Sequence, residues 1–194
     1  MPKTEKSIDK MFNHGDGLFS TNGMMAPTEY IPYVKETVKS LNLRARALEQ
    51  LGLAESDVPE DATLFLYGFN ANATMAWAYK EAGVLISPLV ELTYIFFTST
   101  GAHLYTYRFS TIDPGYKRET TDHFEYSEIE DIEIVAYTVK RVYGTKKTPR
   151  TEIVTFTKLA LSARGHRVFY TCTKNPKTEA MVEKARQKIS DMKG

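Results

Sequence analysis

The sequence lacks most of the features that mark a specialised class of protein. Its 194 residues include one cysteine, and 25 Lys and Arg nearly balance 24 Asp and Glu, which leaves a formal net charge of +1. One cysteine cannot build a disulfide framework, so the fold must depend on its hydrophobic core, as is usual in a reducing compartment. A charge so close to zero argues against nucleic-acid or anionic-membrane binding driven by bulk charge.

Long hydrophobic runs are also missing. The most apolar stretch, residues 84–97, is interrupted by Ser87, Pro88, Glu91 and Thr93, whereas a membrane-spanning helix needs about 20 consecutive apolar residues. The opening residues MPKTEK are not followed by the apolar run of a secretory signal. The sequence therefore predicts a cytoplasmic protein without a transmembrane segment.

Motifs that carry catalysis or cofactors are not found. There is no G-x-S-x-G, G-x-G-x-x-G or C-x-x-C, and no histidine pair has metal-ligand spacing. Cys172 alternates with Val168 and Tyr170 along an expected strand, which indicates a buried structural thiol. We predict a non-enzyme with no cofactor, no catalytic residues and no metal site. The remaining alternative is an unrecognised hydrolase or metal enzyme that uses Cys172 or the four histidines, namely His14, His103, His123 and His166.

What the sequence does contain begins with an N-terminal region, residues 1–56, predicted to be an irregular arm followed by an amphipathic helix. Residues 12–27 are rich in Gly, Asn, Ser and Thr, as irregular chain is. Pro32 suits the first turn of the helix and Gly52 its C-terminal cap. An apolar stripe at three- and four-residue steps is formed by Val34, Val38, Leu41, Ala45 and Leu48.

The composition changes in residues 57–194, where aromatic and β-branched residues dominate up to a last helix. The expected strands are 62–70, 92–99, 102–111, 124–128, 131–142, 151–161 and 166–173. Turns are expected at 99–101, 113–115 and 164–165. Asn175 and Pro176 should begin the terminal helix, whose expected apolar stripe is Val182, Ala185, Ile189 and Met192.

Seven short strands joined by hairpins and followed by one helix predict a mainly β (α+β) fold: a curved antiparallel sheet or barrel whose open end the helix covers. The segments FFTSTGAHLY (96–105) and FEYSEIEDIEI (124–134) resemble bacterial pleckstrin-homology-like (PH-like) domains of the GRAM type. The preceding ALEQLGL (47–53) is similar to a group of bacterial PH-like proteins of unknown function. The resemblance implies a seven-stranded barrel capped by the C-terminal helix, with an added N-terminal helix, and it carries no catalytic residues.

Two functions follow as expectations. The first is a non-catalytic module that acts through a protein partner or self-association. The second is a lipid- or phosphate-binding module using a basic loop that contains Lys140, Arg141, Lys146, Lys147 and Arg150. The structural interpretation of that loop is a solvated hairpin tip whose charges prevent edge pairing.

Two other ligand classes are not expected. Residues 70–91 contain Lys80 as their only basic residue, which argues against phosphoinositide binding, since phosphate needs several converging cations or amides. The strand aromatics are interleaved only with Arg108, which argues against a base-stacking nucleic-acid surface.

Overall fold

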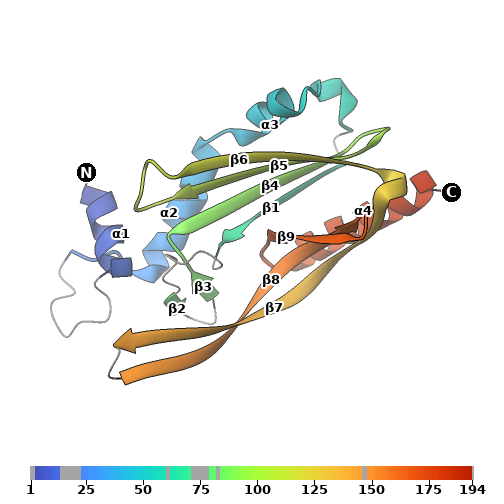
Figure 1. Cartoon of the computed structure of the whole chain (residues 1–194). Coiled ribbons are helices and arrows are strands. Elements are labelled where there is room, and N and C mark those ends of the chain that lie inside the picture. Colours follow the sequence, from blue (N-terminus) through green and yellow to red (C-terminus); the bar gives the residue numbers. More distant parts are fainter. Residues whose placement is uncertain are drawn as a thin grey trace.

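A computed structural model describes residues 3–13, 23–59, 62–70, 79–81, 84–145 and 148–193 of the chain (Figure 1). Its N-terminal elements are α1 (Lys3–Asn13), α2 (Pro27–Ser40), α3 (Leu43–Leu51) and the 3-10 turn η1 (Glu55–Asp57). The strands are β1 (Thr63–Phe69), β2 (Tyr79–Glu81), β3 (Val84–Ile86), β4 (Leu89–Phe97), β5 (Gly101–Ser110), β6 (Lys117–Glu125), β7 (Ile129–Thr145), β8 (Thr148–Ala163) and β9 (His166–Thr171). A second 3-10 turn, η2 (Tyr126–Glu128), joins β6 to β7, and α4 (Pro176–Lys193) ends the chain.

The larger strands form two antiparallel sheets. One has the order β1-β4-β5-β6 and the other β7-β8-β9, while β2 and β3 pair only with each other. The predicted α+β class is confirmed, as is a terminal helix after the last strand. The closed barrel is not observed, because no strand of one sheet pairs with a strand of the other among the described residues.

Most strand predictions are confirmed within a few residues, but the one at 124–128 is wrong. The strand there is β6, which begins at Lys117, and residues 126–128 form η2. The carboxylate of Glu128 accepts a hydrogen bond from the backbone N–H of Glu125 at 2.9 Å and holds this turn. β6 escaped prediction because eight of its nine residues are exposed, so no apolar alternation marks it.

The N-terminal region contains more helix than the pattern indicated. The predicted single helix is two, because Asn42 adopts a left-handed conformation (φ 43°) between α2 and α3. Gly52, with φ 65°, caps α3 as predicted. The helix α1 was not predicted, and its Ile8 is fully buried. Much of the stretch expected to be irregular, residues 14–22, lies outside the described residues.

The four-stranded sheet is covered on both faces (Figure 1). One face packs against α1–α3 in a cluster that includes Tyr30, Val34 and Tyr105. The opposite face packs against the three-stranded sheet and α4, in a cluster that includes Leu64 and Val182. Alternate residues of each strand therefore pack into two different hydrophobic cores. The helix α4 lies beside the β1 edge.

Candidate functional site: a groove between an edge strand and the terminal helix

β1 is an edge strand with half of its backbone groups turned outward. The N–H of Phe97 donates to the carbonyl of Ala62 at 2.9 Å, and that of Asn70 donates to Leu89 at 2.8 Å. In an antiparallel pair the bonded positions alternate, so even-numbered residues pair with β4. The backbone N–H and C=O groups of Thr63 and Phe65 therefore point away from the sheet, and no described residue hydrogen-bonds to them.

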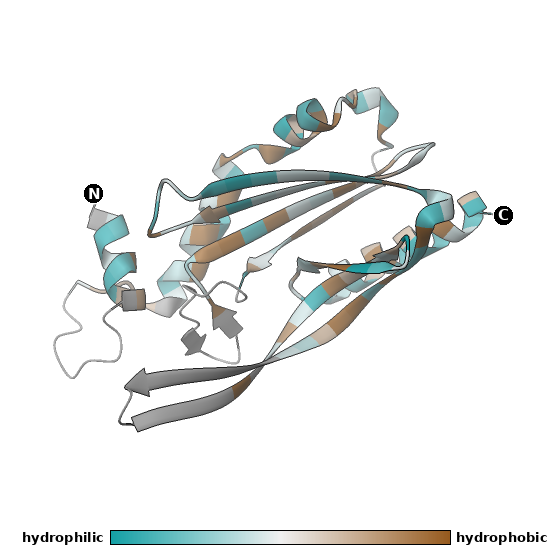
Figure 2. Cartoon of the chain, in the orientation of Figure 1, coloured by the Kyte–Doolittle hydropathy of each residue, from teal (hydrophilic) through white to brown (hydrophobic). Residues whose placement is uncertain are grey.

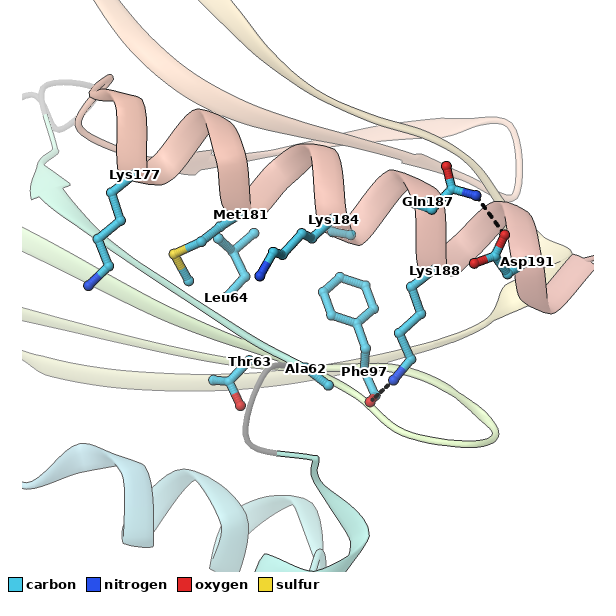
Figure 3. A pocket seen from close by; sticks show the side chains of 11 residues that line it. Ala62, Thr63, Leu64, Phe97, Lys177, Met181, Lys184, Gln187, Lys188 and Asp191 are labelled. Carbon is cyan, nitrogen blue, oxygen red and sulfur yellow. Dashed lines mark hydrogen bonds between the residues drawn. The ribbon is translucent and has the colours of Figure 1, made fainter.

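A groove runs along this open edge, between β1 and α4. Its main cavity, of about 580 Å³, has an apolar floor of Leu64, Phe97 and Met181 (Figure 3). A second cavity of about 160 Å³ continues along Phe65 and Tyr67 and shares Met181 with the first. The groove therefore follows the strand over most of its length.

Lysines from α4 line the groove. Lys177, Lys184 and Lys188 reach down from the helix toward β1 (Figure 3). The ammonium group of Lys188 donates to the carbonyl of Phe97 at 3.0 Å. Lys177 and Lys184 make no hydrogen bond or ion pair with any residue that the structure describes. Asp191, the acid at the far end, accepts a hydrogen bond from Gln187 at 2.6 Å. Because the three lysines outnumber the one acid, the groove carries a net positive charge.

The local sequence of α4 explains this arrangement. Asn175 caps the helix as predicted, since its side-chain oxygen accepts the N–H of Thr178 at 3.0 Å. The predicted stripe is confirmed at Val182, Ala185 and Ile189, which are buried. Met192 was wrongly included, because it is 46% exposed.

A buried carboxylate on β4 holds β9 on the face of the sheet, near one end of the β1 edge. The side chain of Glu91 is 3% exposed. It accepts hydrogen bonds from Arg108 Nε at 2.6 Å and from the backbone N–H of Thr171 at 2.7 Å. This second bond fixes the end of β9 against β4, over the face of the sheet at Gly68. A Cβ added at Gly68 would lie 2.6 Å from Cγ2 of Thr171, so only glycine allows the approach. Beyond it, the hydroxyl of Thr173 donates to the carbonyl of Tyr67 at 3.3 Å.

The other face of the sheet carries half-buried aromatic rings beside the same edge. The rings of Phe65 and Tyr94 lie 4.6 Å apart, and those of Phe65 and Tyr67 lie 6.0 Å apart. Arg44 donates to the hydroxyl of Thr63 at 3.1 Å and pairs with Glu55 at 2.7 Å. A strand added to β1 would thus meet aromatic side chains on one face and the groove on the other.

The structure describes none of the side chains of the binding residues that were predicted from the sequence. Lys146 and Lys147 fall in a gap, and the side chains of Lys140, Arg141 and Arg150 are likewise not described. Their backbones, where given, belong to the long β7–β8 hairpin. The lipid- or phosphate-binding alternative therefore stays a prediction.

The structure describes Cys172 and three of the four histidines of the hydrolase or metal-enzyme alternative; His14 lies outside the described residues. Cys172 is buried as predicted, and burial raises the pKa of its thiol to about 11, so the nucleophilic thiolate is scarce at neutral pH. The rings of His103 and His123 stack at 4.2 Å. Among the described residues, no three His, Cys, Asp or Glu side chains are grouped to hold a metal ion.

The chain matches no family model, no curated protein and no solved structure. No helix in the described ranges is long and apolar enough to cross a membrane. The groove itself was missed by sequence reasoning. The available signals were a strand without charges, TLFLYGF, and lysines seven and four residues apart on the last helix.

Proposed function

We propose that this protein is a non-catalytic interaction module that binds an extended, acidic segment of a partner protein along the β1–α4 groove. The segment adds as a strand to β1. The observation that carries the proposal is the row of outward backbone groups at Thr63 and Phe65, which no described residue pairs with, beside an apolar groove lined by lysines.

A peptide backbone is the occupant whose chemistry fits this edge best. Outward N–H and C=O groups are satisfied by another extended chain, whose alternate side chains then enter the adjacent groove. A hydrocarbon chain would fill the floor of Leu64 and Phe97 but would leave the backbone row without partners. The backbone row therefore favours a protein segment over a lipid.

The charge of the groove selects an acidic segment. Lys177 and Lys184 have no acidic partner among the residues described. Complementary charge at the rim of an interface raises the association rate and suppresses wrong partners. Because these cations are solvent-exposed, salt should weaken the interaction.

The PH-like assignment is part of the same proposal. The order of four strands, three strands and a terminal helix supports it, together with the residues that resemble GRAM-type domains. The binding proposal does not depend on it, since function belongs to the site and not to the fold.

The test is a selection of random peptides on the full chain, followed by fluorescence anisotropy with the selected sequences. We expect acidic, extended peptides whose affinity falls at least tenfold in the double variant Lys177→Glu, Lys184→Glu. The matched control is Lys117→Glu, Arg118→Glu on β6, the opposite edge of the same sheet, which should bind as wild type does.

Three outcomes would contradict the proposal. One is that no peptide is selected, and another is that affinity is equal in both double variants. The third is a dimer, measured by light scattering, that the Lys177→Glu, Lys184→Glu variant disrupts. That result would place a second copy of the chain in the groove instead of a partner.

A further inference from the structure

We infer that the bound segment carries an acid, an apolar residue and a second acid at alternate positions, in the order acid-x-apolar-x-acid. The inference rests on the proposed function and specifies the sequence pattern that the groove binds. It follows from the way α4 lies along β1.

The helix and the strand run side by side in opposite directions. Lys177, near the start of α4, lines the cavity beside Phe65 and Tyr67. Lys188, near its end, lies beside Phe97, and Phe97 is bonded to Ala62 at the start of β1. Distances along the helix can therefore be compared with distances along an added strand.

The spacing of groove residues on α4 matches an extended chain. With about 1.5 Å of rise per residue, Met181 lies about 6 Å beyond Lys177, and Lys184 and Lys188 lie about 10 and 16 Å beyond it. Alternate residues of a strand are about 6.7 Å apart, so every fourth residue is about 13 Å away. A first acid at Lys177 therefore places the next groove-facing residue at Met181. The third groove-facing residue, the second acid, lies between Lys184 and Lys188.

The middle position must be apolar. It faces the floor formed by Met181, Leu64 and Phe97, where an aliphatic side chain removes apolar surface from water. A charge at that position would be desolvated without a partner.

The open edge also sets the length of the segment. Residues facing the groove lie opposite the even-numbered residues of the strand, Ala62, Leu64 and Leu66, since partners across a sheet share a face. At the far end of the strand, the hydroxyl of Thr173 already donates to the outward carbonyl of Tyr67. The five positions opposite residues 62–66 therefore accommodate one copy of the motif, whose x residues lie opposite Thr63 and Phe65.

Two labelled peptides of identical composition test the spacing. Both are flanked by Gly-Ser; one contains Glu-Thr-Val-Thr-Glu and the other Thr-Glu-Val-Glu-Thr, which turns both acids to the other face. Fluorescence anisotropy with the full chain should show at least tenfold tighter binding of the first. The peptide Lys-Thr-Val-Thr-Lys should bind weakly to wild type and regain affinity in the variant Lys177→Glu, Lys184→Glu.

The outcomes separate this inference from the proposed function. Equal binding of the two acidic peptides would overturn the spacing while leaving strand addition intact. Failure of both, while library-selected peptides bind in the groove, would also overturn the spacing alone. Absence of any groove-dependent peptide contradicts the proposed function itself. Recovery of the charge-reversed peptide in the charge-reversed variant supports both.

Discussion

The two edges of the four-stranded sheet differ in charge and in burial. β6 carries charge along most of its length, including Lys117, Arg118, Glu119 and Asp122, and Phe124 is its one buried residue. β1 carries no charged residue and alternates between buried and half-buried positions. Figure 2 shows β6 as hydrophilic along nearly its whole length, in contrast to the apolar segments of its neighbours.

The difference indicates which edge is available to a partner. Charged side chains on an edge strand prevent pairing with another chain, so β6 is protected by its own sequence. β1 lacks this protection, and its open part is limited by packing: Thr173 donates to the outward carbonyl of Tyr67 at one end, and α4 lies beside the rest. Because packing and not charge limits access to β1, a segment of the right shape can add to this edge as a strand.

The largest effect is expected from removing the buried carboxylate of Glu91, which holds β9 on the four-stranded sheet. Glu91→Ala leaves Arg108 without its carboxylate and the N–H of Thr171 without its acceptor. Breaking a buried ion pair costs about 3–5 kcal/mol, and the lower figure applies because the Arg108 side chain is 32% exposed. Urea unfolding measures the loss. The control Glu183→Ala removes an exposed pair with Arg186 and should cost under about 0.5 kcal/mol; equal losses would contradict the account.

A smaller effect is expected where β9 meets β1. Gly68→Ala places a Cβ against Cγ2 of Thr171, and overpacking of this kind costs about 1–3 kcal/mol. Thr171→Ser removes that methyl group, so the double variant should regain most of the lost free energy of unfolding. Full stability of Gly68→Ala, or no rescue by Thr171→Ser, would show that the two strands are not in close contact.

The smallest effect is expected from His103 of β5, whose ring stacks on His123 of β6. Burial first, and the neighbouring His123 second, lower the pKa of His103. The unfolded chain, with a His pKa of about 6.5, then binds more protons than the folded chain. Stability is therefore lost as the pH falls through about 6.5 toward the lower folded-state pKa. His103→Gln should flatten this dependence in urea titrations at pH 5–8, whereas exposed His166→Gln should not; the same slope in all three proteins would exclude His103 as the cause.

Local sequence signals predicted much of the fold. The turns at 99–101 and 113–115, the Asn175 cap and the buried Cys172 each depend on neighbouring residues, and each is confirmed. The charged strand β6 carries no such signal, whereas the left-handed break occurs at Asn42, a residue type that favours this conformation and whose signal was not used.

The candidate site could not be predicted in this way. Leu64 and Lys184 are far apart in the sequence, and only the packing of α4 on the sheet brings them to one groove. The free edge of β1 is likewise a property of strand order, which a single strand sequence does not contain.

Backbone amide exchange gives the most direct test of the central claim that β1 is the docking edge. The full chain would be measured by NMR with and without the peptide that contains Glu-Thr-Val-Thr-Glu, or a library-selected binder. Strand addition predicts that the amide protons of Thr63 and Phe65, which point outward, exchange more slowly in the complex, while those of β6 do not change. Slower exchange along β6 with none at Thr63 and Phe65 would contradict the claim.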